Sequence, residues 1–460
     1  MRTRHYLLLL PALLLSACSL NTPIPDSAIV PPAHWSTQTT NAQWPARDWW
    51  QQYQSPSLED LLAQAEAGNL DLASAASRLR QADAQLRLAS ASLLPQVSAS
   101  ADTNRNGDTG STAYSARLNT RYELDFWGRN QAITDSARAS LLASEFDTQT
   151  LAISIQASVV SNWLQILENA QRLDLARNSL ANAERVLQLV ETRYRFGAAD
   201  SLAVSQQRTL VAQLRARLPG LEQQRLQLRN SMALLLGQAP DTPLPKARHL
   251  ADINIPVVGA GLPAELINRR PDILASEARL IAANADLTAA RAALFPSVTL
   301  TGQFGAQSAA LATLLSNPVT GWAIAAGLTQ SIFNGGALRA QVALSQARQE
   351  DLLIDYRRTL LTALGEADTA LGAVKKARQA YQFLELATTE ARRAFDLAEI
   401  RYRTGSSDLQ SLLDTQRTLY QSQDTLTQQR AVWLLASVDL FRVLGGGWRM
   451  PEVYGSDGLR

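Results

Sequence analysis

The longest helical segment of this chain constrains its fold more than any other feature. Residues 129–196 contain neither proline nor glycine, and apolar residues recur along them at helical spacing. At about 1.5 Å per residue, one helix of this length would extend roughly 100 Å, several times the width of a compact domain. In the second half, the apolar residues follow the a/d pattern of a coiled coil: Leu173, Ala176, Leu180, Ala183, Leu187 and Val190. The sequence therefore predicts long paired helices rather than a compact globular enzyme.

The same unit occurs twice in the chain. Residues 193–197 (Arg-Tyr-Arg-Phe-Gly) return as 401–405 (Arg-Tyr-Arg-Thr-Gly), and 207–210 (Gln-Arg-Thr-Leu) return as 416–419. The helical seam returns as well, at Tyr381, Leu384, Thr388, Ala391, Phe395 and Ala398. Self-similarity at this scale indicates two copies of one supersecondary unit.

The first residues have the features of a bacterial lipoprotein signal. Arg2 and Arg4 precede a short apolar run at 7–15, which is too short to span a bilayer, and small residues come directly before Cys18. This pattern predicts that the Cys18 thiol is lipidated and that Cys18 becomes the mature N-terminus. An ordinary signal peptide that happens to contain a cysteine is the alternative. Ser19, in place of an aspartate, favours the outer membrane over the inner one. Because Cys18 is the only cysteine, no internal disulfide is expected.

Two stretches alternate apolar and polar residues, and they predict strand hairpins at about 95–124 and 296–333. The alternation is clearest at Tyr114, Ala116, Leu118, Thr120, Tyr122 and Leu124. Each arm has the roughly ten residues that a tilted strand needs to cross a bilayer, although a surface hairpin on a soluble domain is the alternative. One chain supplies four such strands, whereas the smallest closed barrels have about eight, and an open sheet leaves its edges unpaired in lipid. The strands therefore predict an oligomer, with a narrow filled barrel from two chains or a wider one from three.

Each long helix is followed by a predicted reversal. Gly197 and Gly405 stand where a left-handed residue closes a helix, and Asp200 and Asp408 stand where a side chain caps the next one. The returning helix of the first copy contains Pro219–Gly220, which is expected to kink or interrupt it.

Composition excludes several classes of protein. The formal net charge of +2 gives no reason to expect a nucleic-acid partner. Outside the signal, no apolar run of transmembrane-helix length is expected. The mature chain has two histidines, His34 and His249, far apart in proline-containing connectors, and it lacks a phosphate-binding glycine loop, a nucleophile elbow and a cysteine–histidine cluster. No enzyme activity, cofactor or metal is therefore expected. A structural coiled-coil envelope lipoprotein would explain the rods but not the strand hairpins.

The predicted organisation combines these segments. It begins with a signal peptide (1–17) and a lipidated extended segment (18–55). The first repeat (56–240) contains a helix pair broken at Gly68–Asn69, a strand hairpin at about 95–124 and a coiled-coil hairpin at about 129–237. A connector (241–262) leads to the second repeat (263–445), with a strand hairpin at about 296–333 and a coiled-coil hairpin at about 336–445, and a flexible tail (446–460) follows.

Taken together, the lipobox, the duplicated unit and two motifs resemble the outer-membrane efflux factor family. The motifs are Asp125–Arg129 (Asp-Phe-Trp-Gly-Arg) and Arg269–Ile273 (Arg-Arg-Pro-Asp-Ile). The chain is similar to the NodT-type, OprM-like lipoproteins and more distantly to TolC. The resemblance implies a mainly α fold with a membrane β-barrel: a homotrimer with a twelve-stranded barrel in the outer membrane, continuous with a periplasmic α-helical tube.

The resemblance also implies a function and partners. It implies a passive channel that exports small molecules handed over by an RND-type inner-membrane transporter and a periplasmic adaptor. The chain would be anchored in the outer membrane of a Gram-negative bacterium by an N-acyl diglyceride on Cys18 and would extend into the periplasm. A type I protein-secretion channel uses the same architecture and remains the alternative.

By the same resemblance, the periplasmic end closes near the second reversal. The family's constricting aspartate falls on Asp414, with Arg417 one turn on and Tyr402 beside it. Three copies of Asp414 around a threefold axis would repel or take up protons, and ion pairs to Arg417 could hold the ring closed. The alternative is that Asp414 is a solvated residue near the helix start, stabilised by the helix dipole.

The gate region departs from the family patterns at three positions. Ser411 and Ser407 stand where TolC carries a further aspartate and an arginine, so a two-ring acidic gate does not follow from this sequence. Gln410 stands where the OprM-like pattern has a leucine, so an apolar ring does not follow from this sequence either. The candidate gate residues are Asp414, Arg417, Tyr402 and Gln410.

Overall fold

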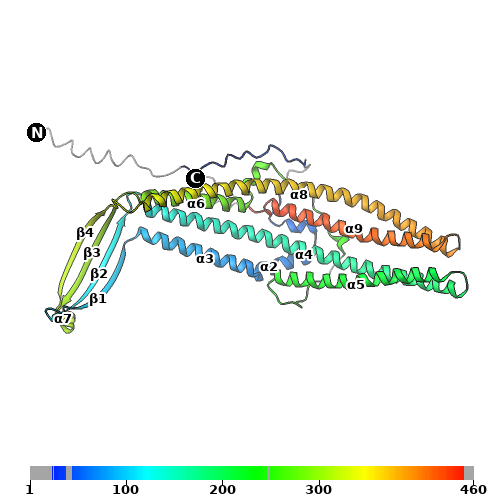
Figure 1. Cartoon of the computed structure of the whole chain (residues 1–460), viewed down its shortest axis with the longest axis horizontal. Helices are drawn as coiled ribbons and strands as arrows, with labels where there is room; N and C mark the ends of the chain where they lie inside the picture. Colours follow the sequence, from blue (N-terminus) through cyan, green and yellow to red (C-terminus); the bar gives the residue numbers. More distant parts are fainter. Residues whose placement is uncertain (1–22, 24, 38–43, 246–248, 258, 450–460) are drawn as a thin grey trace. The chain divides into compact units, whose positions relative to one another are not determined.

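The structure is a computed structural model that describes residues 23, 25–37, 44–245, 249–257 and 259–449. The predictions for the signal peptide and for Cys18 lie outside the described residues. The described chain is mainly helical and contains one four-stranded sheet, so the predicted fold class is confirmed (Figure 1).

The two repeats contain matching elements. Helices α4 and α8 have 67 residues each, and α5 and α9 have 35 each, as a duplicated unit requires. The first repeat comprises α2 (Pro56–Gly68), α3 (Leu70–Ser90), β1 (Gln96–Arg105), β2 (Thr112–Leu124), α4 (Arg129–Arg195) and α5 (Ser201–Leu235). The second comprises α6 (Pro271–Ala292), β3 (Ser297–Ser308), α7 (Leu311–Ser316), β4 (Val319–Thr329), α8 (Ala337–Arg403) and α9 (Leu409–Val443). Short 3-10 helices are η1 (Trp49–Tyr53), η2 (Ala91–Leu93), η3 (Leu250–Asp252) and η4 (Pro263–Asn268). The sequence analysis identified neither α6 nor α7.

The chain divides into two compact units. The first takes the described residues of 1–29, 77–146 and 274–359, and it contains the sheet. The second takes the described residues of 30–76, 147–273 and 360–460. In the first unit, the strands pair antiparallel in the order β1-β2-β3-β4, so the two hairpins join through β2 and β3 (Figure 1).

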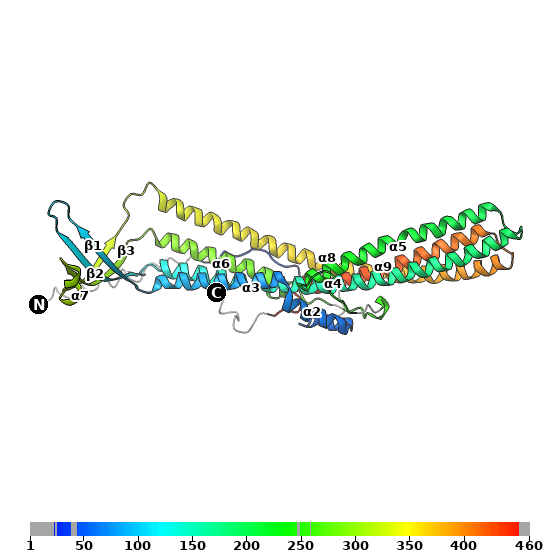
Figure 2. The ribbon, with the colours of Figure 1, turned by 90° about the horizontal axis from the view of Figure 1, so that it is seen from below.

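Two apolar clusters hold the second unit together. One surrounds Trp49, whose ring stacks on that of Phe441 at 4.6 Å between centroids, while the Tyr53 hydroxyl hydrogen-bonds Ser437 Oγ at 2.8 Å. The N-terminal segment was predicted to be extended, but it ends in the helix η1 because the Trp49 and Tyr53 side chains are buried in this cluster. The other cluster joins α4, α5, α8 and α9, whose two hairpins lie side by side toward their reversals (Figure 2).

Two expectations about the long helices need correction. Helix α5 is continuous from Ser201 to Leu235 although it contains Pro219, so the expected interruption does not occur. Leu214 and Leu228, on either side of the proline, are buried, and this packing stabilises the helix. Helix α4 includes an apolar window that could cross a membrane by length and composition, and 44% of that window is buried in the protein. Helix α4 places buried apolar side chains such as Val159 and Val160 in the Trp49 cluster, as a core helix does.

The predicted flexible tail does not begin at residue 446. Gly445, Gly446 and Gly447 are buried and have positive φ angles of 88°, 56° and 73°. A Cβ on Gly446 would lie 2.9 Å from Ile153, and one on Gly447 would meet the Ala46 carbonyl oxygen. The three glycines are therefore a tightly packed turn, which only glycine fits.

Candidate functional site: a two-faced sheet and two helix reversals

The sheet has one apolar face. The register places Leu118, Phe304 and Trp322 side by side across β2, β3 and β4. Trp322 and Ile324 are each 76% exposed, although large apolar side chains normally avoid water. The same face carries Val97, Ala99, Ala101, Tyr122, Leu124, Val298, Leu300, Ala326 and Leu328. A face of this composition is suited to contact with lipid.

The opposite face is polar and hollowed. Along β2 it presents Arg117, Asn119, Arg121 and Glu123, and the register places Gln303 beside Asn119. The other members of this face are Gln96, Ser98, Ser100, Asp102, Ser115, Thr299, Thr301 and Gln307, with small residues such as Gly321, Ala323 and Ala325 on β4. Alternation of this kind, with lipid on one side and water on the other, is the pattern of a membrane barrel wall.

The motif at 125–129 builds the junction between β2 and α4. Asp125 accepts hydrogen bonds from the N–H groups of Asn130 and Gln131, at 3.1 and 2.7 Å, and so caps the helix. Gly128 takes a φ of +71°, which favours glycine. Arg129 binds both carboxylate oxygens of Glu123 at 3.0 Å. Strand and helix are thus tied together by local contacts within the motif.

Aromatic side chains gather at the same end of the sheet. The Trp127 ring stacks on Phe295 at 4.9 Å, and its Nε1 donates to the Pro296 carbonyl oxygen at 2.7 Å. Phe126 is 62% exposed, and Phe333 is 91% exposed. Exposed rings next to a polar-tipped tryptophan are typical of the interface between lipid and water.

The two reversals have one design. In each, the N–H of the third residue after the helix donates to the carbonyl oxygen five residues earlier: Ala198 to Arg193 and Ser406 to Arg401, both at 2.8 Å. Gly197 and Gly405 occupy the left-handed position between them, with φ angles of 72° and 79°. These are Schellman motifs, and they turn the chain within a few residues.

An aspartate starts each returning helix. Asp200 accepts a hydrogen bond from the Ala203 N–H at 2.8 Å, and Asp408 accepts one from the Ser411 N–H at 2.9 Å. The hydrogen bond from the Ser411 N–H holds the pKa of the Asp408 carboxyl below its usual value. The glycine and aspartate at each reversal therefore act as a C-terminal and an N-terminal cap.

Three of the four candidate gate residues share an exposed face of α9. Gln410 Nε2 donates to both oxygens of Asp414 at 3.1 Å, and Arg417 Nη1 lies 3.9 Å from Asp414 Oδ1. The opposite face of α9 is buried and includes Leu409, Leu412, Leu413, Gln416 and Leu419. The exposed face is therefore polar, with an aspartate that is only loosely paired within its own chain.

The fourth candidate, Tyr402, does not join that face. It is 5% exposed, and the Arg193 guanidinium lies 4.8 Å from its ring centroid and donates to its carbonyl oxygen at 2.8 Å. Tyr194, which holds the matching position in the first repeat, is 50% exposed. Tyr402 therefore joins the two helix hairpins rather than standing beside Asp414.

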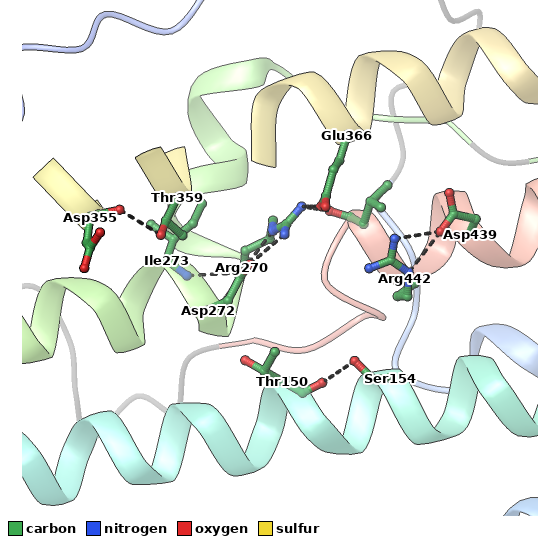
Figure 3. Close-up of polar contacts among 11 residues, drawn as sticks. Thr150, Ser154, Arg270, Asp272, Ile273, Asp355, Thr359, Glu366, Asp439 and Arg442 are labelled. Carbon is green, nitrogen blue, oxygen red and sulfur yellow. Dashed lines mark hydrogen bonds and ion pairs between the residues drawn. The ribbon is translucent and has the colours of Figure 1, made fainter. Parts of the chain in front are cut away.

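The motif at 269–273 forms a buried ion-pair network. Arg270 precedes α6 and points toward Glu366 of α8, with Asp272 on its other side (Figure 3). Its Nε and Nη2 donate to the two oxygens of Asp272 at 3.0 and 2.6 Å, and its Nη1 donates to Glu366 at 2.8 Å and to the Val443 carbonyl oxygen at 3.2 Å. Burial opposes the charged form of Arg270, but these contacts outweigh burial and raise its pKa above the usual value.

A comparison of the sequence with known protein families identifies the family to which the chain belongs. The model of the family described as outer membrane efflux protein matches residues 61–238 and 262–446, one block in each repeat. The chain belongs to this family. The predicted resemblance is thereby confirmed, and the chain is an outer-membrane component of efflux.

Relatives of this efflux protein match it over nearly its full length. The pyoverdine export outer membrane protein OpmQ of Pseudomonas putida is 40% identical, with 97% of this chain and 98% of OpmQ covered. The outer membrane protein OprJ of Pseudomonas aeruginosa is 34% identical over 96% of this chain and 95% of its own. Among solved structures, the outer-membrane channel OprN superposes with a TM-score of 0.87 at 30% identity, covering 93% of this chain and 99% of its own.

The sequence analysis missed the charged residues on the polar face of the sheet. It used the apolar positions of β2, and the intervening positions, including Arg117 and Arg121, were the signal that could have identified the polar face. It also did not assign partners to Arg270 of the efflux protein's motif. Within the described part of the chain, no group of three or more His, Cys, Asp or Glu side chains is placed to hold a metal ion.

Proposed function

We propose that this chain is the outer-membrane channel of a tripartite efflux pump, a homotrimer that passively exports small molecules. The inner-membrane partner is an RND-type transporter, and a periplasmic adaptor joins the two. The sequence match to a pyoverdine export protein over nearly the whole chain supports a small-molecule cargo. Protein secretion has no such support among the described features.

The open edges of the sheet carry the proposal. Among the described residues, the outer edges of β1 and β4 pair with no other strand, and β4 has no charged residue and no proline. A sheet with an apolar face and unpaired edges cannot lie in lipid unless it closes. Three copies of the four-stranded sheet supply twelve strands, which suits a water-filled barrel, whereas two copies would give a narrow barrel filled by side chains.

The proposal includes the N-terminal anchor and the division of the chain. Removal of residues 1–17 and acylation of Cys18 would tether the protein to the outer membrane. An N-acyl diglyceride adds membrane affinity without a transmembrane helix. The two repeats, 56–240 and 263–445, each supply one strand hairpin and one coiled-coil hairpin to the barrel and to the periplasmic tube.

The proposal also includes a gate at the second reversal. Around a threefold axis, three Asp414 side chains would lie near one another, and each has only a weak contact with Arg417 in its own chain. Pairing with Gln410 and Arg417 of neighbouring copies would offset their repulsion and close the periplasmic end. Tyr402 would support the gate from behind by holding the two helix hairpins together through Arg193.

Two measurements on the detergent-purified full chain test the function. Light scattering corrected for detergent should give about three chain masses, and the particle should form pores in a planar bilayer. A clean monomer without pores would remove the channel function. For the gate, Asp414→Ala should increase single-channel conductance, while Asp439→Ala, an exposed aspartate near the other end of α9, should not. Equal conductance in Asp414→Ala and the wild type would remove Asp414 from the gate.

A further inference from the structure

The charged side chains on the polar face of the sheet are unequally paired. The four strands carry five charged residues, of which Asp102, Arg117, Arg121 and Glu123 lie on the polar face. Arg117 lies 3.7 Å from Asp102, and Glu123 is held by Arg129 through both oxygens. Among the described residues, Arg121 lies within ion-pair distance of no carboxylate. The strands contribute two positive and two negative side chains to this face, but Glu123 is paired with Arg129 of α4, so Arg121 is left without a carboxylate partner in the described part of the chain.

Arg121 lies in a hollow whose lining is suited to anions. The hollow has a volume of about 880 Å³, and its wall includes Arg121, Asn119 and Gln303 together with Ser98, Thr301 and small residues of β4. The wall contains no carboxylate. Guanidinium, amide and hydroxyl groups donate hydrogen bonds, and a guanidinium binds carboxylates in a bidentate manner. The small side chains of Ala323 and Ala325 leave the hollow open.

The neighbouring Arg117 is held apart from this hollow. Its stem lies against Gly305, where a Cβ would come within 2.8 Å of Arg117 Cγ. Arg117 lines a separate hollow of about 500 Å³ with Gln307 and residues of β4. Because Asp102 accompanies Arg117, the Arg121 hollow is the site with the net positive charge.

We infer that three Arg121 side chains form a cationic ring in the lumen of the barrel, and that this ring selects anionic small molecules. The inference rests on the proposed trimeric channel, because only closure of the sheet brings the three copies around one lumen. A ring of like charges around a water-filled lumen raises the local concentration of oppositely charged solutes. The cargo class is a small molecule that carries a carboxylate or a comparable anion, with further groups that accept hydrogen bonds from Asn119 and Gln303.

Ion selectivity of the reconstituted full chain tests the ring. The reversal potential in a KCl gradient gives the chloride-to-potassium permeability ratio for the wild type and for Arg121→Gln. We expect the ratio to fall by about twofold or more in Arg121→Gln and to be retained in Arg121→Lys, which keeps the charge. The difference should disappear near 1 M salt, where the screening length is only about 3 Å.

Arg105→Gln is the matched control. It removes the same charge from β1, but Arg105 lies on the opposite face of the sheet, at the end of the strand. Its permeability ratio should equal that of the wild type. Citrate, added as a trivalent probe, should reduce the wild-type current more than the current through Arg121→Gln.

The outcomes separate this inference from the proposed function. A wild-type chain that remains monomeric and forms no pore overturns the channel and the cationic ring together. A conducting trimer whose permeability ratio and citrate block are the same in Arg121→Gln and the wild type overturns the ring alone. A shift of equal size in Arg105→Gln also overturns it, because the effect would then be independent of the face.

Discussion

Removal of the Arg270 side chain should loosen the end of α9. Arg270 is 7% exposed and binds three partners: the nearby Asp272, and Glu366 and the Val443 carbonyl oxygen, which are distant in the sequence. In Arg270→Met, a side chain of similar length fills the site, but two carboxylates and one carbonyl oxygen lose their donor. The perturbation is therefore electrostatic rather than a large cavity.

The magnitude follows from the burial of the partners. Breaking a buried ion pair by removing one partner costs about 3–5 kcal/mol. The side chains of Asp272 and Glu366 are 30% and 36% exposed, so water compensates them in part, and we expect about 3 kcal/mol. At about 1.4 kcal/mol per tenfold, amide exchange by local opening should become roughly a hundredfold faster around residues 269–273 and 440–445.

Hydrogen exchange of the detergent-purified protein, followed by mass spectrometry of its peptides, measures this effect. Arg442→Met is the control, because among the described residues Arg442 is paired only with the exposed Asp439 on the same helix (Figure 3). Such surface pairs contribute about 0–1 kcal/mol. Adding Glu366→Gln to Arg270→Met should recover part of the loss, since one unpaired carboxylate is removed. Exchange in Arg270→Met that is no faster than in Arg442→Met would refute the reasoning.

Three further predictions concern the ends of the long helices. Gly447→Ala should destabilise the protein in thermal unfolding, because its Cβ would meet backbone at a positive φ, and an unchanged midpoint would contradict the close packing. Because the pKa of Asp408 is lowered below the ordinary 3.8, its cap is complete above that pH and is lost as the pH falls through the folded value. Loss of the cap should increase amide exchange at the second reversal as the pH falls. In Asp408→Asn the capping side chain does not titrate, so this increase should be absent. Equal pH profiles of amide exchange in Asp408→Asn and the wild type would show that Asp408 does not cause the increase. Tyr402→Ala should lower the free energy of unfolding by about 3 kcal/mol, whereas Tyr194→Ala should change it by no more than about 0.5 kcal/mol. Equal amide exchange rates at the reversals in the two variants would contradict the difference in burial between the two tyrosines.

What the sequence could predict depended on the distance between interacting residues. The reversals depend on a glycine and an aspartate that contact backbone within five residues, so the local pattern was sufficient. The two faces of the sheet follow from alternation, which is a property of every strand. The partners of Arg270 lie 96 and 173 residues away at Glu366 and Val443, and no local pattern indicates them.

The two repeats differ in the burial of matching residues, and sequence similarity between the repeats does not predict this difference. Tyr194 and Tyr402 share the same motif, yet one is half exposed and the other is covered by Arg193. Arg193 itself belongs to the first copy, so the motif of one repeat packs on the motif of the other. A repeat aligned only to itself predicts equal roles for both tyrosines. The asymmetry arises from the packing of the two hairpins against each other, and it leaves the first copy's tyrosine free for contacts outside this chain.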